Sequence, residues 1–259
     1  MSGVLEFRAP ELARGPFLFA PGHLRASPGR VTVLLGPNGG GKSTALRLAA
    51  GLLVPDRGEV LLGGAPICRM SARDRASRLS LVVQRPEVGA PLTVIEVVRL
   101  GRVALSPAPG AAERALARVG LSDAAGRPYH SLSGGQQQRV SVARALAQHA
   151  EGGVLLLDEA FAAIDPPEAA SLVREIRAEA SRGATVLAAT HDLAIASALA
   201  DDAWCVVDGR TRAFGPSAEV LAPSTLSSLL GVGVCGAPGS RGTIAVADFA
   251  AMLPPSARP

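Results

Sequence analysis

The sequence has few aromatic residues and few cysteines, and it has no long hydrophobic run. Only 3% of its 259 residues are aromatic, and the three cysteines, Cys68, Cys205 and Cys235, are scattered. An odd and scattered set fits a reducing cytosol better than a disulfide framework or a zinc site. No apolar run approaches the roughly 18 residues that a bilayer-spanning helix needs, so we expect a soluble protein.

Charge and targeting signals are weak as well. The first residues have neither the basic segment nor the apolar core of a secretory signal. Lys and Arg number 26 against 22 Asp and Glu, a surplus of +4 that is spread along the chain. The densest basic cluster is Arg69, Arg73, Arg75 and Arg78, but Asp74 lies among them and no aromatic residue interleaves. This pattern favours a solvated helix face over a nucleic-acid-binding patch, and we expect no nucleic-acid partner.

The one lysine of the chain, Lys42, lies in a glycine-rich stretch between an apolar run at 31–35 and a helical pattern at 45–50. In this context the pattern GxxxxGK[ST] indicates a phosphate-binding loop, because backbone N–H groups converge on phosphate oxygens at the helix N-terminus. Lys42 would reach the β- and γ-phosphates, and Ser43 would bind Mg²⁺. The predicted nucleotide-binding residues are Gly36, Pro37, Asn38, Gly39, Gly40, Gly41, Lys42, Ser43 and Thr44.

A glycine turn that merely joins strand to helix is the alternative. It does not explain why a sequence that uses arginine for every other fixed cation has a lysine at this position. A compact ammonium binds phosphate as a point charge, which a planar guanidinium does not.

Two further stretches have features of phosphate chemistry. The Ser-Gly-Gly turn at 133–135 leads into a helical pattern at 137–148, and such a turn is a second anion-binding geometry. The apolar run at 154–157 ends in Asp158 and Glu159, and a third apolar run at 185–190 ends before His191. Ligands bind at the carboxyl ends of parallel strands, so Asp158 is expected to meet Mg²⁺ and Glu159 a water. Helix caps and plain strand ends are the structural alternatives.

The remaining pattern predicts an α/β fold. Its core is a mostly parallel sheet flanked by helices, preceded by a small antiparallel region. Expected strands are at 4–8, 17–19, 31–35, 59–64, 79–83, 154–157, 185–190, 204–207 and 212–214. Expected helices are at 71–78, 94–102, 111–120, 137–148, 166–181, 193–200 and 226–230, and a second hairpin is expected from 232–234 and 243–246.

The expected organisation is a single domain over 1–259. Residues of about 86–131 have only helical patterns, and a connection this long should have structure of its own, so we expect a helical insertion subdomain. Residues of about 223–259 form a C-terminal extension with weak signals. Trp204 is expected in the core, and His23 and His149 on the surface.

Taken in order, these stretches resemble the ATP-binding subunit of an ABC transporter, over nearly the whole chain. GPNGGGKST resembles the family's Walker A motif, Gln84 its Q-loop, LSGGQQQR at 132–139 its signature, VLLLDE its Walker B motif, Asp165 its D-loop and His191 its switch histidine. The stretches at 91–102 and 214–221 look most like the branch that serves importers of iron chelates, haem and cobalamin.

The resemblance implies a P-loop NTPase fold and an ATPase that uses ATP and Mg²⁺. Glu159 would orient or deprotonate the attacking water, His191 would stabilise the transferring phosphoryl group, and Gln84 would sense the metal and the γ-phosphate. The implied metal-binding residues are Ser43, Gln84 and Asp158.

The resemblance also implies partners. Two copies would form a head-to-tail homodimer, in which a loop of one copy caps ATP held on Lys42 of the other. The residues implied in that second contact are Ser133, Gly134, Gly135, Gln136 and Asp165. In the family, the insertion contacts integral membrane permease subunits, which work with an extracytoplasmic substrate-binding protein. The chain would then be peripheral to the cytoplasmic face of the inner membrane.

The sequence departs from the family's pattern at three places. Ala160 and Phe161 stand where the family usually has Pro-Thr, which alters the loop that follows. The aromatic residue that stacks on adenine is not evident: its position falls near Ala13, and Phe17 is a weak substitute. Gly40 replaces the usual Ala or Ser, which should loosen the phosphate-binding loop.

Three classes of function are therefore compared. An importer ATPase for an iron chelate, haem or cobalamin is the first hypothesis, with another cargo as its nearest variant. A soluble ABC-type ATPase that acts on DNA or in metallocluster assembly is the second, although the DNA-clamping kind has a long coiled coil and no heptad run occurs here. A non-hydrolysing regulator is the third; Glu159 and His191 count against it, whereas Ala160 and Phe161 keep it open.

Overall fold

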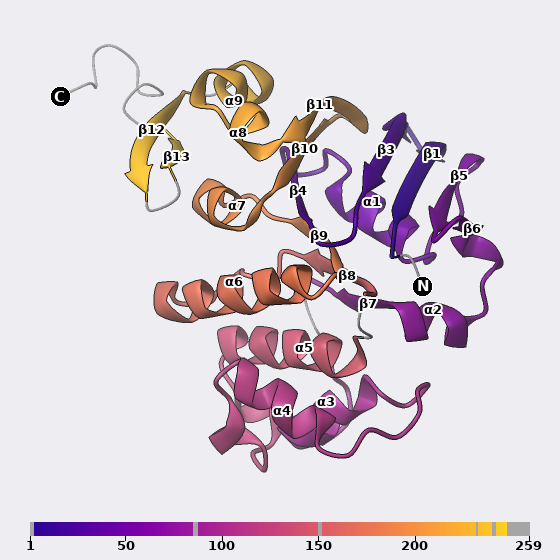
Figure 1. The fold of residues 1–259 in the computed structure, drawn as a ribbon, viewed down its shortest axis with the longest axis vertical. Helices are drawn as coiled ribbons and strands as arrows, with labels where there is room; N and C mark the ends of the chain where they lie inside the picture. The colour runs from indigo at the N-terminus through magenta and orange to yellow at the C-terminus, as the bar shows by residue number, and fades with distance from the viewer. Residues whose placement is uncertain (1–2, 85–87, 150–151, 232, 240–241, 248–259) are drawn as a thin grey trace.

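The structure is a computed structural model that describes residues 3–84, 88–149, 152–231, 233–239 and 242–247. Its centre is a six-stranded sheet with the strand order β11-β10-β4-β9-β8-β7 (Figure 1). Neighbouring strands are parallel except for the β10–β11 hairpin. The strands are β4 (Val31–Leu35), β7 (Leu79–Val82), β8 (Val154–Asp158), β9 (Thr185–Ala189), β10 (Asp202–Val207) and β11 (Arg210–Pro216).

A second, antiparallel sheet is formed by the N-terminal part of the chain, as predicted. Its strands are β1 (Leu5–Arg14), β2 (Phe17–Phe19), β3 (His23–Ala26), β5 (Arg57–Leu62) and β6 (Ala65–Pro66). The strand β1 is much longer than the expected 4–8. A bulge between Arg8 and Glu11 shifts its register, after which the strand continues and pairs with β2. The short strand β3 was not predicted.

The helix α1 (Lys42–Ala49) lies between the two sheets and contacts β5, β8 and β9. Its buried residues share one core with the antiparallel sheet and with one face of the main sheet. In that core the rings of Phe7 and Trp204 meet edge to face with centroids 5.2 Å apart, so the predicted core position of Trp204 is confirmed. The packing of α1 against both sheets holds the loop before it in place.

The other face of the main sheet is covered by α5 (Gly134–Gln148), α6 (Pro166–Ser181) and α7 (Leu193–Leu199). The strand β4 shows the alternation: Val31, Val33 and Leu35 belong to this helical side, whereas Leu34 belongs to the core around α1. A strand buried on both faces reads as a continuous apolar run, which is why it was predicted.

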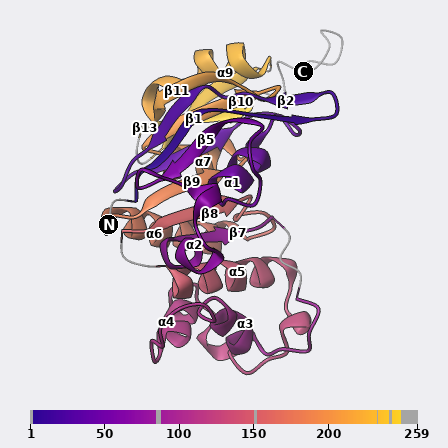
Figure 2. The same cartoon turned by 90° about the vertical axis from the view of Figure 1, so that its right-hand side faces the viewer.

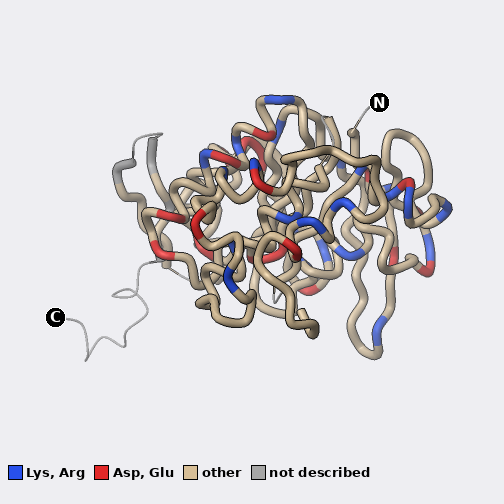
Figure 3. Tube along the Cα trace, turned by 90° about the horizontal axis from the view of Figure 1, so that it is seen from below, with Lys and Arg blue, Asp and Glu red and all other residues tan. Residues whose placement is uncertain are grey.

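Two short helices, α3 (Val94–Leu100) and α4 (Ala111–Arg118), pack against α5 on the side away from the sheet (Figure 2). Both occur where helical patterns were expected. The expected start of the insertion at 86 lies outside the described residues, and the division into subdomains stays a prediction. Figure 3 views the molecule from this side and shows basic and acidic segments intermingled along the trace.

Smaller elements complete the chain. They are the 3₁₀ turns Ile67–Arg69, Ser122–Ala124 and Tyr129–Ser131, the helices α2 (Ala72–Arg78), α8 (Ser217–Val220) and α9 (Pro223–Leu230), and the hairpin of β12 (Val234–Gly239) and β13 (Gly242–Ala247). Ser71 caps α2, since its side chain accepts a hydrogen bond from the Asp74 N–H at 3.0 Å. Among the described residues, no helix is long and apolar enough to cross a bilayer.

The prediction that His149 lies on the surface is wrong. Its side chain is only 3% exposed and lies at the end of α5, beside the carboxylate of Glu179 on α6. Burial lowers the pKa of His149 below its usual value, Glu179 opposes that shift, and the charges of Arg118 and Arg182 add to it. The apolar pattern of α5 gave no sign of this packing, because the histidine follows the last helical turn.

We expect His149 to weaken the fold in acid. Because its pKa is lower in the folded state, the unfolded state takes up the proton first as the pH falls below about 6.5. Above that pH, His149 is neutral in both states and the fold keeps its full free energy of unfolding. Part of this free energy is lost as the pH falls through the pKa that His149 has in the folded protein. The free energy of unfolding, measured in urea between pH 7 and pH 5, should fall more steeply for the parent than for His149→Gln. The exposed His23 offers the control His23→Gln, and equal slopes for all three proteins would contradict the prediction.

Candidate functional site

The predicted phosphate-binding loop runs from the end of β4 to the start of α1 and rests against the backbone of β10. Gly36 has a φ of +143°, and a Cβ at this position would lie 1.9 Å from the Val206 carbonyl oxygen. Gly40 is also closely packed: its carbonyl accepts from the Gly209 N–H at 2.9 Å, and an added Cβ would lie 2.9 Å from the same Val206 oxygen. The glycine at position 40 therefore permits a close approach of two backbones, where a loosened loop was expected.

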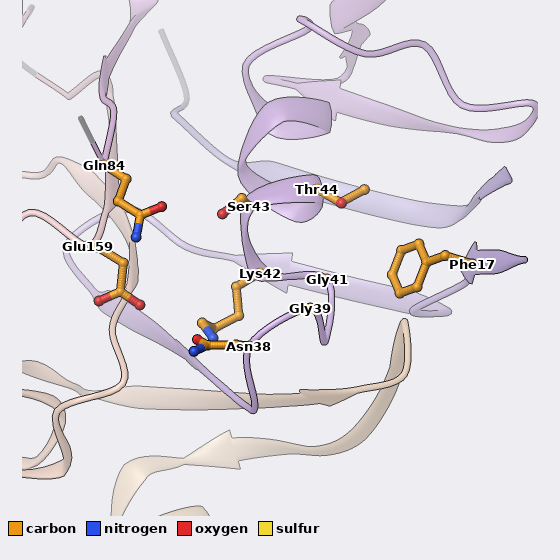
Figure 4. A pocket seen from close by; sticks show the side chains of 9 residues that line it. All are labelled: Phe17, Asn38, Gly39, Gly41, Lys42, Ser43, Thr44, Gln84 and Glu159. Carbon is orange, nitrogen blue, oxygen red and sulfur yellow. The ribbon is translucent and has the colours of Figure 1, made fainter. Parts of the chain in front are cut away.

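A cavity of about 420 Å³ opens beside this loop (Figure 4). Glu159 and Gln84 lie on one side of it and Phe17 on the other, with the loop between them. The residues that line it are Phe17, Asn38, Gly39, Gly41, Lys42, Ser43, Thr44, Gln84 and Glu159. The fold thus brings residues from four separate stretches of the chain to one space.

Lys42 is buried at the floor of the loop. Its Nζ donates hydrogen bonds to the carbonyl oxygens of Gly36 at 2.8 Å and Pro37 at 3.2 Å. Burial lowers the pKa of Lys42, and the charges of Glu159 and Asp158 oppose that shift. The ammonium is thus a partly desolvated cation that points along the loop on which phosphate oxygens would bind.

Asp158 ends β8 directly opposite the loop. Its Oδ1 accepts a hydrogen bond from the Ser43 hydroxyl at 3.1 Å. Burial raises the pKa of Asp158, the Ser43 hydrogen bond opposes that shift, and the charge of Glu159 adds to it. A hydroxyl and a carboxylate that meet here are hard oxygen donors of the kind that Mg²⁺ prefers.

The residues fit a magnesium ion whose coordination shell is shared with a substrate. Among the described residues, no three His, Cys, Asp or Glu side chains come together as a metal-binding group. Mg²⁺ is commonly held by one or two protein oxygens together with waters and substrate phosphates. Ser43 and Asp158 supply two such oxygens, and Gln84 lines the same cavity.

Glu159 and His191 are in contact. The Nδ1 atom of His191 lies 2.8 Å from Oε2 of Glu159, and the Glu159 N–H donates to the Ala189 carbonyl at 3.0 Å. Glu159 has a φ of +51°, a left-handed conformation that is strained for a residue with a side chain. The buried carboxylate is thus held at a strained turn, while the His191 side chain is 69% exposed.

The second predicted phosphate-binding turn lies elsewhere. Ser133 begins α5, where its Oγ accepts from the Gln136 N–H at 3.3 Å and the Gln136 Oε1 accepts from the Ser133 N–H at 3.1 Å. This capping box starts the helix at Gly134 rather than at the expected 137. Asp165 precedes α6, but its side chain makes no capping hydrogen bond. None of the residues expected from this turn, nor Asp165, lines the cavity around Lys42.

Phe17 lines the cavity, although the sequence made it only a weak substitute for an adenine-stacking residue. The extended β1 pairs Arg14 with Phe17, so the turn between them returns the phenyl ring to the loop. Ala13 is exposed and does not line the cavity. The missing signal was the bulge in β1, which lengthens that strand and has no clear sequence signature.

Ala160 and Phe161 follow Glu159 and are buried in the main core. The turn continues through Ala163, which has a φ of +58°, and reaches Asp165. Gly135 packs against this turn: a Cβ on Gly135 would lie 2.3 Å from the Ala163 carbonyl oxygen. Ala160 and Phe161, which stand where the family usually has Pro-Thr, therefore place two apolar side chains in the core. The loop that follows them packs against the first turn of α5.

Comparisons with known proteins converge on one family. Residues 21–162 match the family described as ABC transporter. A protein of Agrobacterium fabrum named hemin import ATP-binding protein HmuV is 38% identical over 80% of this chain and 82% of its own length. A Myxococcus xanthus protein of the same name is 37% identical over 97% and 99%. The structure of cbiO1 from Clostridium perfringens, part of the ABC transporter complex cbiONQ, covers 88% of this chain and 94% of its own, with a TM-score of 0.73 and 26% identity.

The two glycines that begin α5 differ in their surroundings, which allows a matched test. Gly135→Ala should lower the free energy of unfolding by about 1–3 kcal/mol, because its Cβ collides with the Ala163 carbonyl. Gly134→Ala should have little effect or stabilise slightly, since nothing lies within 4 Å of the added Cβ and alanine favours the helix. Urea unfolding measures both, and equal effects of the two substitutions would show that this contact is not tight.

Proposed function

Because this chain belongs to the ABC transporter family, we propose that it is the ATP-hydrolysing subunit of an importer for hemin, another iron chelate or cobalamin. The observation that supports the ATPase function is that Lys42, Ser43 and Glu159 line one and the same cavity. The cargo rests on the names of relatives 37–38% identical to this chain, which are called hemin import ATP-binding proteins. The names of these relatives thus support an iron chelate as the cargo, and the residues of the site support ATP hydrolysis as the reaction.

ATP would bind with its phosphates on the loop before α1. Lys42 now donates to the carbonyl oxygens of Gly36 and Pro37, and it would exchange these for oxygens of the β- and γ-phosphates. The exchange is favourable because a desolvated ammonium interacts more strongly with charged oxygens than with carbonyls. Phosphoryl transfer depends mostly on positioning and electrostatic stabilisation, so this contact would act in the transition state.

Ser43 and Asp158 would hold the magnesium ion, with Gln84 at the edge of the same cavity. When bound, this ion neutralises charge that develops on the phosphate oxygens. Asp158 must be ionised to serve as a ligand, and the nearby cation would reverse the burial effect that now raises its pKa. Gln84 lines the cavity and lies between β7 and α3 in the chain, so it would link the site to the insertion.

Glu159 would act on the attacking water. Its carboxylate lines the cavity, and His191 holds one of its oxygens through the 2.8 Å contact. A carboxylate fixed in this way can orient a water or accept its proton with the other oxygen. His191 is largely exposed, so it is free to turn from Glu159 toward the γ-phosphate once the site closes.

A second copy of the chain would complete the site. Within one chain Ser133 is exposed, and the turn that it begins does not line the cavity around Lys42. In a head-to-tail homodimer, Ser133, Gly134, Gly135 and Gln136 of one copy, together with its Asp165, would approach the ATP bound to the other. Permease subunits would contact the insertion at the cytoplasmic face of the inner membrane, and an extracytoplasmic protein would deliver the cargo.

Phe17 would provide the surface on which adenine stacks. Phe17→Ala should therefore weaken ATP binding by roughly 5- to 150-fold, the range expected for the loss of one aromatic–base stack. Phe17→Tyr should retain most of the affinity. The matched control is Leu18→Ala, because Leu18 is the next residue on β2, is 41% exposed and does not line the cavity. Titration with a fluorescent ATP analogue measures the affinities, and a Phe17→Ala protein that binds like the parent would contradict the role.

The importer function is tested by reconstituting the chain in liposomes with the permease and the cargo-binding protein that are encoded beside it. Hemin should stimulate ATP hydrolysis and accumulate inside the liposomes. Glu159→Gln should slow hydrolysis by about 10²–10⁴-fold and should still bind ATP, because the loss of a general base leaves the phosphate contacts intact. ATPase activity that no iron chelate or cobalamin stimulates would refute the cargo, and a fully active Glu159→Gln protein would refute the role of Glu159.

A further inference from the structure

A second cavity, of about 440 Å³, lies where the insertion meets the core. Its walls are formed by α4, by the turn after α3, by the C-terminal end of α5 and by the residue after α6. Arginines from three of these places, Arg102, Arg114, Arg118 and Arg182, line it together with His149. It shares no described lining residue with the cavity around Lys42.

The arginines outnumber the acidic groups near them. Arg118 contacts Glu175 and Glu179, and Arg182 contacts Glu179 at 2.8 Å. Arg102 donates only to carbonyl oxygens, to Ala147 at 2.8 Å and Ser106 at 2.6 Å, and Arg114 donates to the Pro109 carbonyl at 3.1 Å. Neither has a carboxylate within ion-pair distance among the described residues. A third carboxylate, Glu113, interacts electrostatically with Arg114 but is ion-paired with Arg99 at 2.6 Å. Four guanidinium groups thus line the cavity while only two carboxylates of the described residues contact them, which leaves the cavity positively charged.

Buried donors at this cavity also lack acceptors. Both ring nitrogens of His149 are buried without a hydrogen-bond partner in the described part of the chain, and its nearest carboxylate oxygen, on Glu179, is 3.8 Å away. The Nε atom of Arg102 is likewise buried without a partner. A neutral imidazole still has one N–H to donate, and buried donors left unpaired destabilise the structure that holds them. Oxygen atoms of a ligand in the cavity would supply the missing acceptors.

We propose that this cavity binds a phosphate group, either as free inorganic phosphate or as the phosphate of a small phosphomonoester. A tetrahedral dianion presents oxygens in several directions, so it can meet guanidinium groups from different helices at once, whereas a planar carboxylate faces one. The negative charge of the dianion matches the positive charge of Arg102 and Arg114, which form no ion pair with a carboxylate in the described part of the chain. The bound group would join α4 of the insertion to the ends of α5 and α6.

The proposal is tested with the full-length chain in a Lys42→Ala background, which weakens phosphate binding at the nucleotide loop. The chain has four histidines, and the His149 ring signals in a proton–nitrogen NMR spectrum are assigned by their loss in His149→Gln. Titration with inorganic phosphate should shift these signals saturably. The bound anion should also raise the pKa of His149. Glycerol phosphate forms the second arm: tighter binding than phosphate identifies a phosphomonoester site, and weaker binding identifies a free-phosphate site.

Variants of the exposed arginines assign the binding to this cavity. Arg114→Ala and Arg182→Ala should each weaken phosphate binding by about tenfold, as expected for one charge-assisted hydrogen bond. Arg73→Ala removes the same charge from the exposed face of α2, away from the cavity, and should leave the affinity unchanged. Thermal unfolding without phosphate shows whether each variant is folded. No saturable shift of the His149 signals, or an equal loss for Arg73→Ala and Arg114→Ala, would overturn the proposal.

Discussion

The structure depends on three parallel strands that end at one level. Ala189 of β9 pairs with Leu34 of β4 on one side and with Asp158 of β8 on the other. This register brings the phosphate-binding loop, the acidic pair at 158–159 and His191 to the same edge of the sheet. Burial then opposes ionisation of both Lys42 and Asp158, because each loses water without a full set of counter-charges. A buried ammonium and a buried carboxylate at one edge of the sheet would each gain a counter-charge from a polyanion and its bound cation.

Local strain accompanies this arrangement. Glu159 and Ala163 adopt left-handed conformations within one turn, and Gly135 fits against that turn only because it has no Cβ. Positions of this kind persist when the surrounding packing over-determines them. Here the buried Ala160 and Phe161 supply that packing, so the core anchors the strained carboxylate from one side while His191 contacts it from the other.

The helix α5 connects the two features outside the loop around Lys42 that are proposed to bind anions. Its first turn begins at Ser133, which is exposed and proposed to meet the ATP of a second copy. His149, at its other end, lines the arginine-rich cavity beside α4. Because α3 and α4 pack along the same helix, a ligand at either end would contact the element that joins these two helices to the sheet.

The sequence by itself determined the α/β fold, the phosphate-binding loop, the strand ends at Asp158 and His191 and the order of the elements, because buried parallel strands and glycine turns leave local signals. It did not reveal the return of Phe17 to the cavity, which depends on the bulge in β1, nor the burial of His149, which depends on how α4, α5 and α6 pack together. Only the tertiary structure decided these two features. The residues that bury His149 come from distant segments of the chain, and the bulge that places Phe17 leaves no mark in the periodicity of the sequence.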